Sequence, residues 1–359
     1  MGKSIKRFLK YFFIAVFAVV LIGTGGFGIL ILSEYKPEPV EKADINGEAS
    51  LCAGFNQEIK IMTWNIGYAA LGEEEDFFMD GGKGVTAQSK EEVEKNLVAI
   101  NRTIAELSPD IAFLQEVDKK SARTFNIDEV ESIGESFQNM SCSYVRNFKC
   151  LFIPYPMPPL ANMDAGLVSL SKFEVMDAER ISLPNPFSLP VRAFNLKRCL
   201  LVERIPIEGT DKELVMANLH LEAYDDGTGK AAQTRFLAEF LNKEYEKGNY
   251  VIAGGDFNQS FSNIDISKYK TDNMKLWQPG FINAEEFGEH FNLLMDCSEP
   301  TCRSLDKPYD DNDKNFQYYM IDGFIVSDNI EVASIETKNF HFKNSDHNPV
   351  LMTVRLKGE

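Results

Sequence analysis

An uncharged, strongly apolar run from Tyr11 to Leu32 sets the first constraint on this chain. It is long enough to cross a bilayer as one helix, which takes about 20 apolar residues. Basic residues between positions 3 and 10 precede it, and Glu34 follows it. This charge bias places the N-terminus inside and the remainder outside the membrane. We therefore predict a cytoplasmic N-terminus (1–10), a transmembrane anchor (11–32) and an extracytoplasmic remainder.

A cleaved signal peptide is the competing interpretation of this run, because such peptides share its basic start and apolar middle. Gly23 to Gly28 is rich in glycine, which is compatible with a cleavage site. However, the run is long for a signal peptide, and no clear small-x-small site follows it. An uncleaved, single-pass anchor in the cell membrane is the favoured hypothesis.

The segment 33–57 has the composition of a linker, with Pro37, Pro39, many charges and little apolar periodicity. Beyond it, strand-like and helix-like patterns mix. Ile59 to Trp64 alternates as a strand does, whereas Glu91 to Leu107 has apolar residues at helical spacing. This mixture predicts sheets covered by helices in one domain over residues 58–359.

Unusual polar residues fall at or next to the ends of the predicted strands, except Asp322, which interrupts the apolar strand from Tyr319 to Phe324. These residues are Asn65, Glu116, His220, Asp256, Asn258, Asp322, Asp346 and His347. Each alone is compatible with an ordinary turn. Strand ends at one edge of a sheet converge in space, and ligand sites favour such edges. Together the residues predict a site.

The chemistry of this set points to a divalent cation and phosphate. Glu116, Asp346 and the amide oxygen of Asn65 are hard oxygen ligands, which suit Mg²⁺ or Mn²⁺. Two histidines and Asp256 supply groups that move protons or stabilise charge. A carboxylate-bound metal beside such groups is suited to the attack of water on phosphorus.

Six short motifs, in this order, resemble those of the endonuclease/exonuclease/phosphatase (DNase I-like) superfamily. They are Thr63-Trp64-Asn65, Leu114-Gln115-Glu116-Val117, Asn218-Leu219-His220, Gly255-Asp256-Phe257-Asn258, Ile321-Asp322-Gly323 and Ser345-Asp346-His347-Asn348-Pro349-Val350. The chain looks like a membrane-anchored, bacterial-type member. The resemblance implies a four-layer α/β sandwich, two mixed β-sheets flanked by helices, with the catalytic site at one end.

The resemblance also implies roles for single residues. Glu116 is expected to be the principal metal ligand, aided by Asn65 and Asp346. His347, oriented by Asp322, is expected to act as general base or phosphate stabiliser.

Three further residues of the motifs receive catalytic roles in the same way. Asp256 is expected to position or activate water or to stabilise the leaving group, and Asn258 to bind a phosphate oxygen. His220 is expected to contact phosphate or act as general acid. Tyr144 and Arg146, between two motifs, are weaker candidates for substrate binding.

The expected function is divalent-metal-dependent hydrolysis of a phosphate ester, on a small molecule or a lipid headgroup outside the membrane. A nuclease is the first alternative, but the net charge of −17 disfavours nucleic acid as a partner. A catalytically inactive binding module is the second. The apolar, proline-rich stretch from Cys150 to Leu160 is expected to be either a packed loop or a lip that touches lipid.

Overall fold

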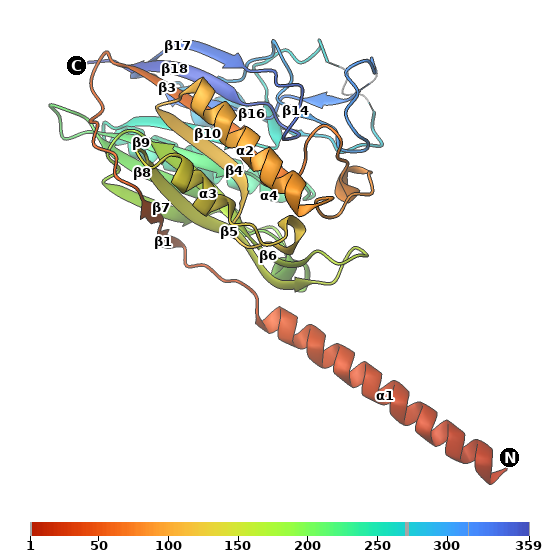
Figure 1. Cartoon of the computed structure of the whole chain (residues 1–359). Coiled ribbons are helices and arrows are strands. Elements are labelled where there is room, and N and C mark those ends of the chain that lie inside the picture. Colours follow the sequence, from red (N-terminus) through yellow and green to blue (C-terminus); the bar gives the residue numbers. More distant parts are fainter. Residues whose placement is uncertain (1, 270–272, 315, 359) are drawn as a thin grey trace.

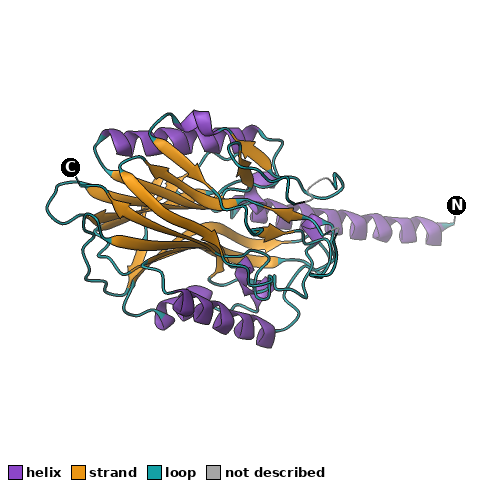
Figure 2. Ribbon diagram, turned by 90° about the horizontal axis from the view of Figure 1, so that it is seen from above, coloured by secondary structure: helices purple, strands orange, loops and turns teal. Residues whose placement is uncertain are grey.

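The computed structural model describes residues 2–269, 273–314 and 316–358. Two seven-stranded sheets pack face to face, with helices on both outer faces (Figure 2). The predicted four-layer α/β sandwich is confirmed. Each sheet is mixed, because β3 and β4 are parallel in one and β9 and β10 are parallel in the other, among antiparallel neighbours.

The first sheet has the spatial order β1 (Val40–Lys42), β7 (Asp177–Ser182), β8 (Cys199–Pro206), β9 (Glu213–His220), β10 (Tyr250–Asp256), β16 (Asp322–Ser327), β13 (Phe291–Leu294). The second has the order β17 (Ile330–Thr337), β18 (Val350–Leu356), β3 (Glu58–Asn65), β4 (Ile111–Asp118), β6 (Ala161–Ser171), β5 (Ser141–Ile153), β2 (Asp44–Asn46). Two small sheets pair β11 (Gln259–Phe261) with β12 (Gly280–Ile282) and β14 (Cys302–Arg303) with β15 (Tyr318–Tyr319).

The core lies between the two sheets and continues under the helices. Phe113, Met216 and Phe324 meet in the apolar layer between the sheets. Helices α2 (Lys90–Leu107) and α3 (Glu129–Ser136) cover the second sheet, and α4 (Thr228–Glu246) covers the first. This burial of apolar faces holds both sheets in one rigid unit.

Helix α2 shows how the sequence sets an element. Its apolar residues recur at helical spacing and are buried, as Val93 and Leu97 illustrate. The hydroxyl of Ser89 caps its first turn by accepting a hydrogen bond from the backbone N–H of Glu92. The helix ends at Ser108, which has left-handed backbone angles.

The segment expected to be a linker is attached to the domain along its length. β1 pairs with β7 at the edge of one sheet, and β2 pairs with β5 at the edge of the other. The proline and charge content of this segment did not predict its two strands, because strands of three residues are too short to show an alternating pattern. Before them, α1 (Lys3–Leu32) projects away from the sandwich (Figure 1). It is long and apolar enough to cross a membrane or to serve as a signal sequence.

Candidate active site

The polar strand ends meet at one end of the sandwich. β3, β4, β9 and β10 point their C-terminal ends there, and the antiparallel β16 and β18 begin there. In the first sheet, Asp256 lies directly opposite His220 on one side and Asp322 on the other. Asp322 therefore opens β16, whereas its apolar neighbours had suggested that it interrupts a strand. Three candidate side chains thus stand in one row across three strands.

His347 is held in place by Asp322. Its Nδ1 lies 2.9 Å from Asp322 Oδ2, and its Nε2 lies 3.8 Å from both Asp256 Oδ2 and Asp346 Oδ2. Burial works against the charged imidazolium, but the carboxylates of Asp322 and Asp346 and the Cys302 thiol outweigh it, so the pKa of His347 is raised well above its ordinary value. The ring is fixed through one nitrogen and presents the other to the cavity.

His220 has the opposite electrostatic environment. Its Nε2 lies 3.3 Å from Asp256 Oδ2 and 4.0 Å from Glu116 Oε1, and its buried Nδ1 has no hydrogen-bond partner. Burial, aided by the positive Arg198, lowers the pKa of His220 well below its ordinary value. The site thus holds one histidine that favours the charged form and one that favours the neutral form.

Glu116 reaches the site through an irregularity in β4. Leu114 pairs with Val168 and Val117 with Gly166, so Gln115 and Glu116 stand where the partner strand has one residue. Glu116 takes a left-handed φ of 54° at this bulge. Bulges redirect side chains near active sites. The strand continues to Asp118, so Glu116 lies within β4 and not at its end as the sequence suggested.

Asn65 braces the acidic groups. Its amide N–H₂ donates to Glu116 Oε1 at 3.1 Å and to Asp256 Oδ2 at 3.0 Å. Its amide oxygen, which was expected to face a metal, instead accepts the backbone N–H of Gly67 at 3.0 Å. In this geometry Asn65 positions two carboxylates.

Asp346 is buried beside these groups. Ser345 fixes the turn before it by donating from its hydroxyl to the carbonyl of Asn65 at 2.7 Å. Burial raises the pKa of Asp346 to about 6, although His347 opposes the rise. Burial and the neighbouring Asp322 likewise raise the pKa of Asp256 to about 7. Several carboxylates crowd together here with little positive charge to balance them.

Two groups of buried side chains have the donor atoms to hold a divalent cation. Asp256, Asp322 and His347 have ligand atoms within 4.8 Å of one another, and so do Cys302, Asp346 and His347. Both groups combine carboxylate oxygens with the imidazole of His347, the second adds the thiol of Cys302, and neither includes Glu116. Burial is the main cause of the raised pKa of Asp346 and repulsion from Glu116 adds to it, so a cation beside both carboxylates would oppose the rise.

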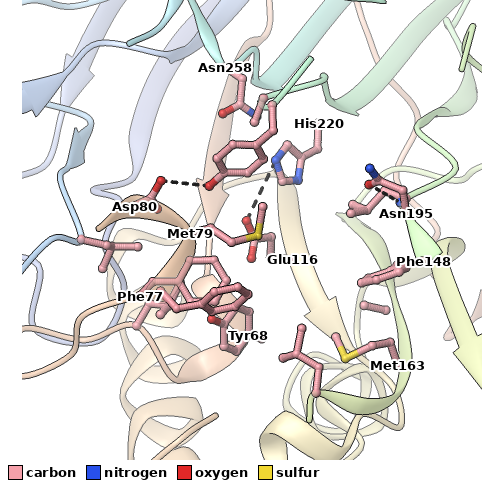
Figure 3. Close-up of a pocket in the computed structure, with 18 of the residues that line it drawn as sticks. Tyr68, Phe77, Met79, Asp80, Glu116, Phe148, Met163, Asn195, His220 and Asn258 are labelled. Atoms are coloured by element: carbon pink, nitrogen blue, oxygen red, sulfur yellow. Dashed lines mark hydrogen bonds and ion pairs between the residues drawn. The ribbon is translucent and has the colours of Figure 1, made fainter. Parts of the chain in front are cut away.

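The site opens into a cavity of about 840 Å³. Six of the candidate residues line it: Glu116, His220, Asp256, Asn258, Asp346 and His347. Figure 3 shows Glu116 and His220 together inside it, with Asn258 above them. Asn65 and Asp322 are not among the lining residues, but each hydrogen-bonds to a side chain that is. The amide N–H₂ of Asn258 donates a hydrogen bond to the carbonyl of Leu221 at 2.9 Å. The side-chain oxygen of Asn258 is therefore left to contact a ligand.

The two weaker candidates are not brought to the site. Tyr144 is buried in the core beneath the second sheet, and Arg146 pairs with Asp164 at 2.5 Å. Neither lines the cavity. Their strand, β5, is at the opposite side of β6 from β4, which carries Glu116.

Two features of the site were missed from the sequence. Gln115 donates to the Asn218 side-chain oxygen at 2.8 Å, and so links the two sheets directly behind the site. Both residues stood in motifs, next to Glu116 and near His220, which was the available signal. Most of the cavity wall is apolar and comes from separate segments, including residues 77–79, β5, β6 and 190–196. No local pattern joins those segments.

Comparisons with known proteins agree with this geometry. Residues 62–296 match the family model described as Endonuclease/Exonuclease/phosphatase family. No curated protein sequence gives a significant match.

Solved structures share the fold at low identity. An endonuclease/exonuclease/phosphatase from Beutenbergia cavernae superposes with a TM-score of 0.57 at 17% identity, covering 84% of this chain and 72% of that one. One from Bacteroides vulgatus gives 0.54 at 16%, covering 84% and 100%. The human Nocturnin catalytic domain gives 0.51 at 16%, covering 88% and 98%.

Proposed function

Because this chain belongs to the endonuclease/exonuclease/phosphatase family, we propose that it is a divalent-metal-dependent hydrolase of phosphate esters. Its substrate is a phosphorylated small molecule or a lipid headgroup outside the membrane. The observation that carries this proposal is the meeting of Glu116, Asp256 and Asp346 with His220 and His347 in one cavity.

Glu116 and Asp346 are the residues that would hold the cation, with Asn65 fixing the position of Glu116 through its amide N–H₂. A bound Mg²⁺ or Mn²⁺ would neutralise charge on the phosphate oxygens. Three observations support this assignment: both residues offer carboxylate oxygens, Asp346 is buried, and no lysine lines the cavity among the described residues.

The protein groups account for the proton movements of hydrolysis. Water adds to phosphorus and gives one proton to Asp256, while the bond between phosphorus and the alcohol oxygen breaks. The departing alcohol takes its proton from the protonated Asp256, whose carboxyl group lies 3.3 Å from His220 Nε2. His347, fixed by Asp322, presents Nε2 to the phosphate oxygens. The products are one alcohol and one phosphate that retains the water oxygen.

The helix α1 supports a location at the membrane. Its apolar length suits an uncleaved anchor, with the catalytic domain on the extracytoplasmic side as the basic N-terminus suggests. A membrane fraction that released the intact protein in high salt without detergent would contradict this part of the proposal.

Nuclease activity is the second candidate, because the same fold occurs in Danio rerio TDP2 complexed with a single-stranded DNA product (TM-score 0.51, 13% identity). The net charge of −17 disfavours it. The test is a panel assayed with Mg²⁺ and Mn²⁺: plasmid DNA, single-stranded DNA, a water-soluble phosphodiester and vesicles containing phospholipids. We expect turnover of the soluble ester or the lipids. DNA cleavage alone would reverse the order of the two candidates.

A further inference from the structure

The cavity continues well beyond the acidic cluster, and this extension is apolar. Figure 3 shows Tyr68 and Phe77 on one side and Phe148 and Met163 on the other, below Glu116. Met79 lies beside Glu116 itself. A volume of about 840 Å³ is near the upper end for small-molecule sites, so there is room for more than a phosphate group.

Two of the three arginines in the lining make hydrogen bonds of 3.0 Å or less to other protein groups. Arg123 donates to Asp118 at 2.8 and 3.0 Å, and Arg303 donates to the carbonyl of Gly72 at 2.6 Å. Arg198 forms an ion pair with Glu222 at 3.7 Å, and its buried Nε has no hydrogen-bond partner. Among the described residues, the lining therefore offers little charge to a second phosphate or to a nucleic-acid strand. An uncharged chain suits the rest of the cavity better.

The apolar end of the cavity is in contact with α1. Phe27, which lies within the candidate membrane span, is itself a lining residue, and its ring stacks on Phe194 with centroids 5.9 Å apart. Just after the helix, buried Glu34 accepts hydrogen bonds from Arg192 at 2.8 Å and pairs with Lys197 at 3.1 Å. The same helix that would enter the bilayer thus forms part of the cavity wall.

The rim near this end exposes apolar side chains. Tyr155 is 69% exposed and Met157 is 82% exposed, both in the turn between β5 and β6, and Val191 is 53% exposed on the neighbouring segment. The turn is the end of the proline-rich stretch, of which residues 150–153 belong to β5. Exposed apolar rims of this kind mark surfaces that meet lipid or protein.

We propose, resting on the function proposed above, that the apolar extension binds an aliphatic chain of a membrane phospholipid whose phosphoester lies at the carboxylate–histidine cluster. The chain enters from the bilayer between Phe27, Phe194 and the 154–160 turn. The substrate is thereby narrowed from phosphate esters in general to those of membrane lipids, because the wall provides apolar contact along the path from the membrane to Glu116.

The test compares p-nitrophenyl alkyl phosphate diesters that carry methyl, octyl or hexadecyl chains, with the full-length protein in detergent. We expect kcat/KM to rise at least 10-fold from methyl to octyl, because each CH₂ that leaves water for the apolar wall adds favourable binding free energy. Phe194→Ser should lose most of this gain in kcat/KM between the methyl and octyl esters. Phe281→Ser, which alters an exposed phenylalanine outside the cavity, should keep the gain and so controls for effects of the micelle.

A second measurement does not require catalysis. A phospholipid with a diazirine in its acyl chain, placed in phosphatidylcholine vesicles with the full chain, should crosslink to Phe148, Met163 or Phe194. Adducts confined to the outside of α1, or equal kcat/KM for all chain lengths, would overturn the inference. If no ester were hydrolysed, the proposed function would fail, and the crosslinks would still decide whether a chain occupies the cavity.

Discussion

Asp322 Oδ2 lies 2.9 Å from Nδ1 of His347, and both side chains are buried. Asp322→Asn removes the negative charge that holds the ring and raises its pKa. We expect kcat for a soluble phosphodiester to fall by about 100-fold or more, with the fold retained. Asp328→Asn is the matched control, because Asp328 makes the same 2.9 Å contact with His290 at the surface, away from the cavity. Similar kcat values for both variants would refute the role given to Asp322.

Metal binding can be measured without a substrate. Mg²⁺ or Mn²⁺ should raise the melting temperature of the wild-type protein, and EDTA should reverse the rise. A ligand at one hundred times its Kd stabilises the folded state by about 2.7 kcal/mol. Glu116→Gln should abolish most of this effect, whereas Glu94→Gln, an exposed carboxylate on α2, should not. Equal stabilisation of all three proteins would place the cation elsewhere.

Glu203, buried on β8, predicts a dependence of stability on pH that is separate from catalysis. Burial raises its pKa to about 7, above the ordinary 4.5. The folded state therefore keeps a proton that the unfolded state loses, and stability falls as pH rises from about 4.5 through 7. Glu203→Gln should raise the free energy of unfolding at pH 8 by roughly 1–3 kcal/mol and change it little at pH 4.

The measurement for Glu203 is urea unfolding of the wild type and the variant at both pH values. Glu208→Gln, on the exposed turn after the same strand, serves as the control. A variant as pH-dependent as the wild type would show that another group is responsible.

Much of the fold was predictable because its signals are local. β3 extends one residue beyond the predicted strand at each end, and α2 begins one residue before the predicted start. The strand-end residues could be predicted to form one site because the C-terminal ends of adjacent parallel strands lie at the same edge of a sheet. His220 and Asp256 were therefore neighbours by topology alone.

Other features depend on contacts that no short pattern encodes. The bulge at Glu116 is defined by how β4 pairs with β6. The two strands in the 33–57 segment form by pairing with the edge strands β7 and β5. Tyr144 was a weaker candidate for substrate binding, but β5 carries it into the core. The apolar cavity wall joins Phe27 to Phe148 and Phe194, far apart in the sequence.

The most direct test of the proposed site is release of p-nitrophenol from bis-p-nitrophenyl phosphate with Mg²⁺ or Mn²⁺. The wild-type protein should turn over the ester, and EDTA should stop it. Glu116→Gln and His347→Ala should each lower kcat/KM by at least about 100-fold, since removal of one such charge-stabilising group typically costs 10²–10³. Activity that survives EDTA, or wild-type rates in either folded variant, would contradict a metal-assisted site built on these two residues.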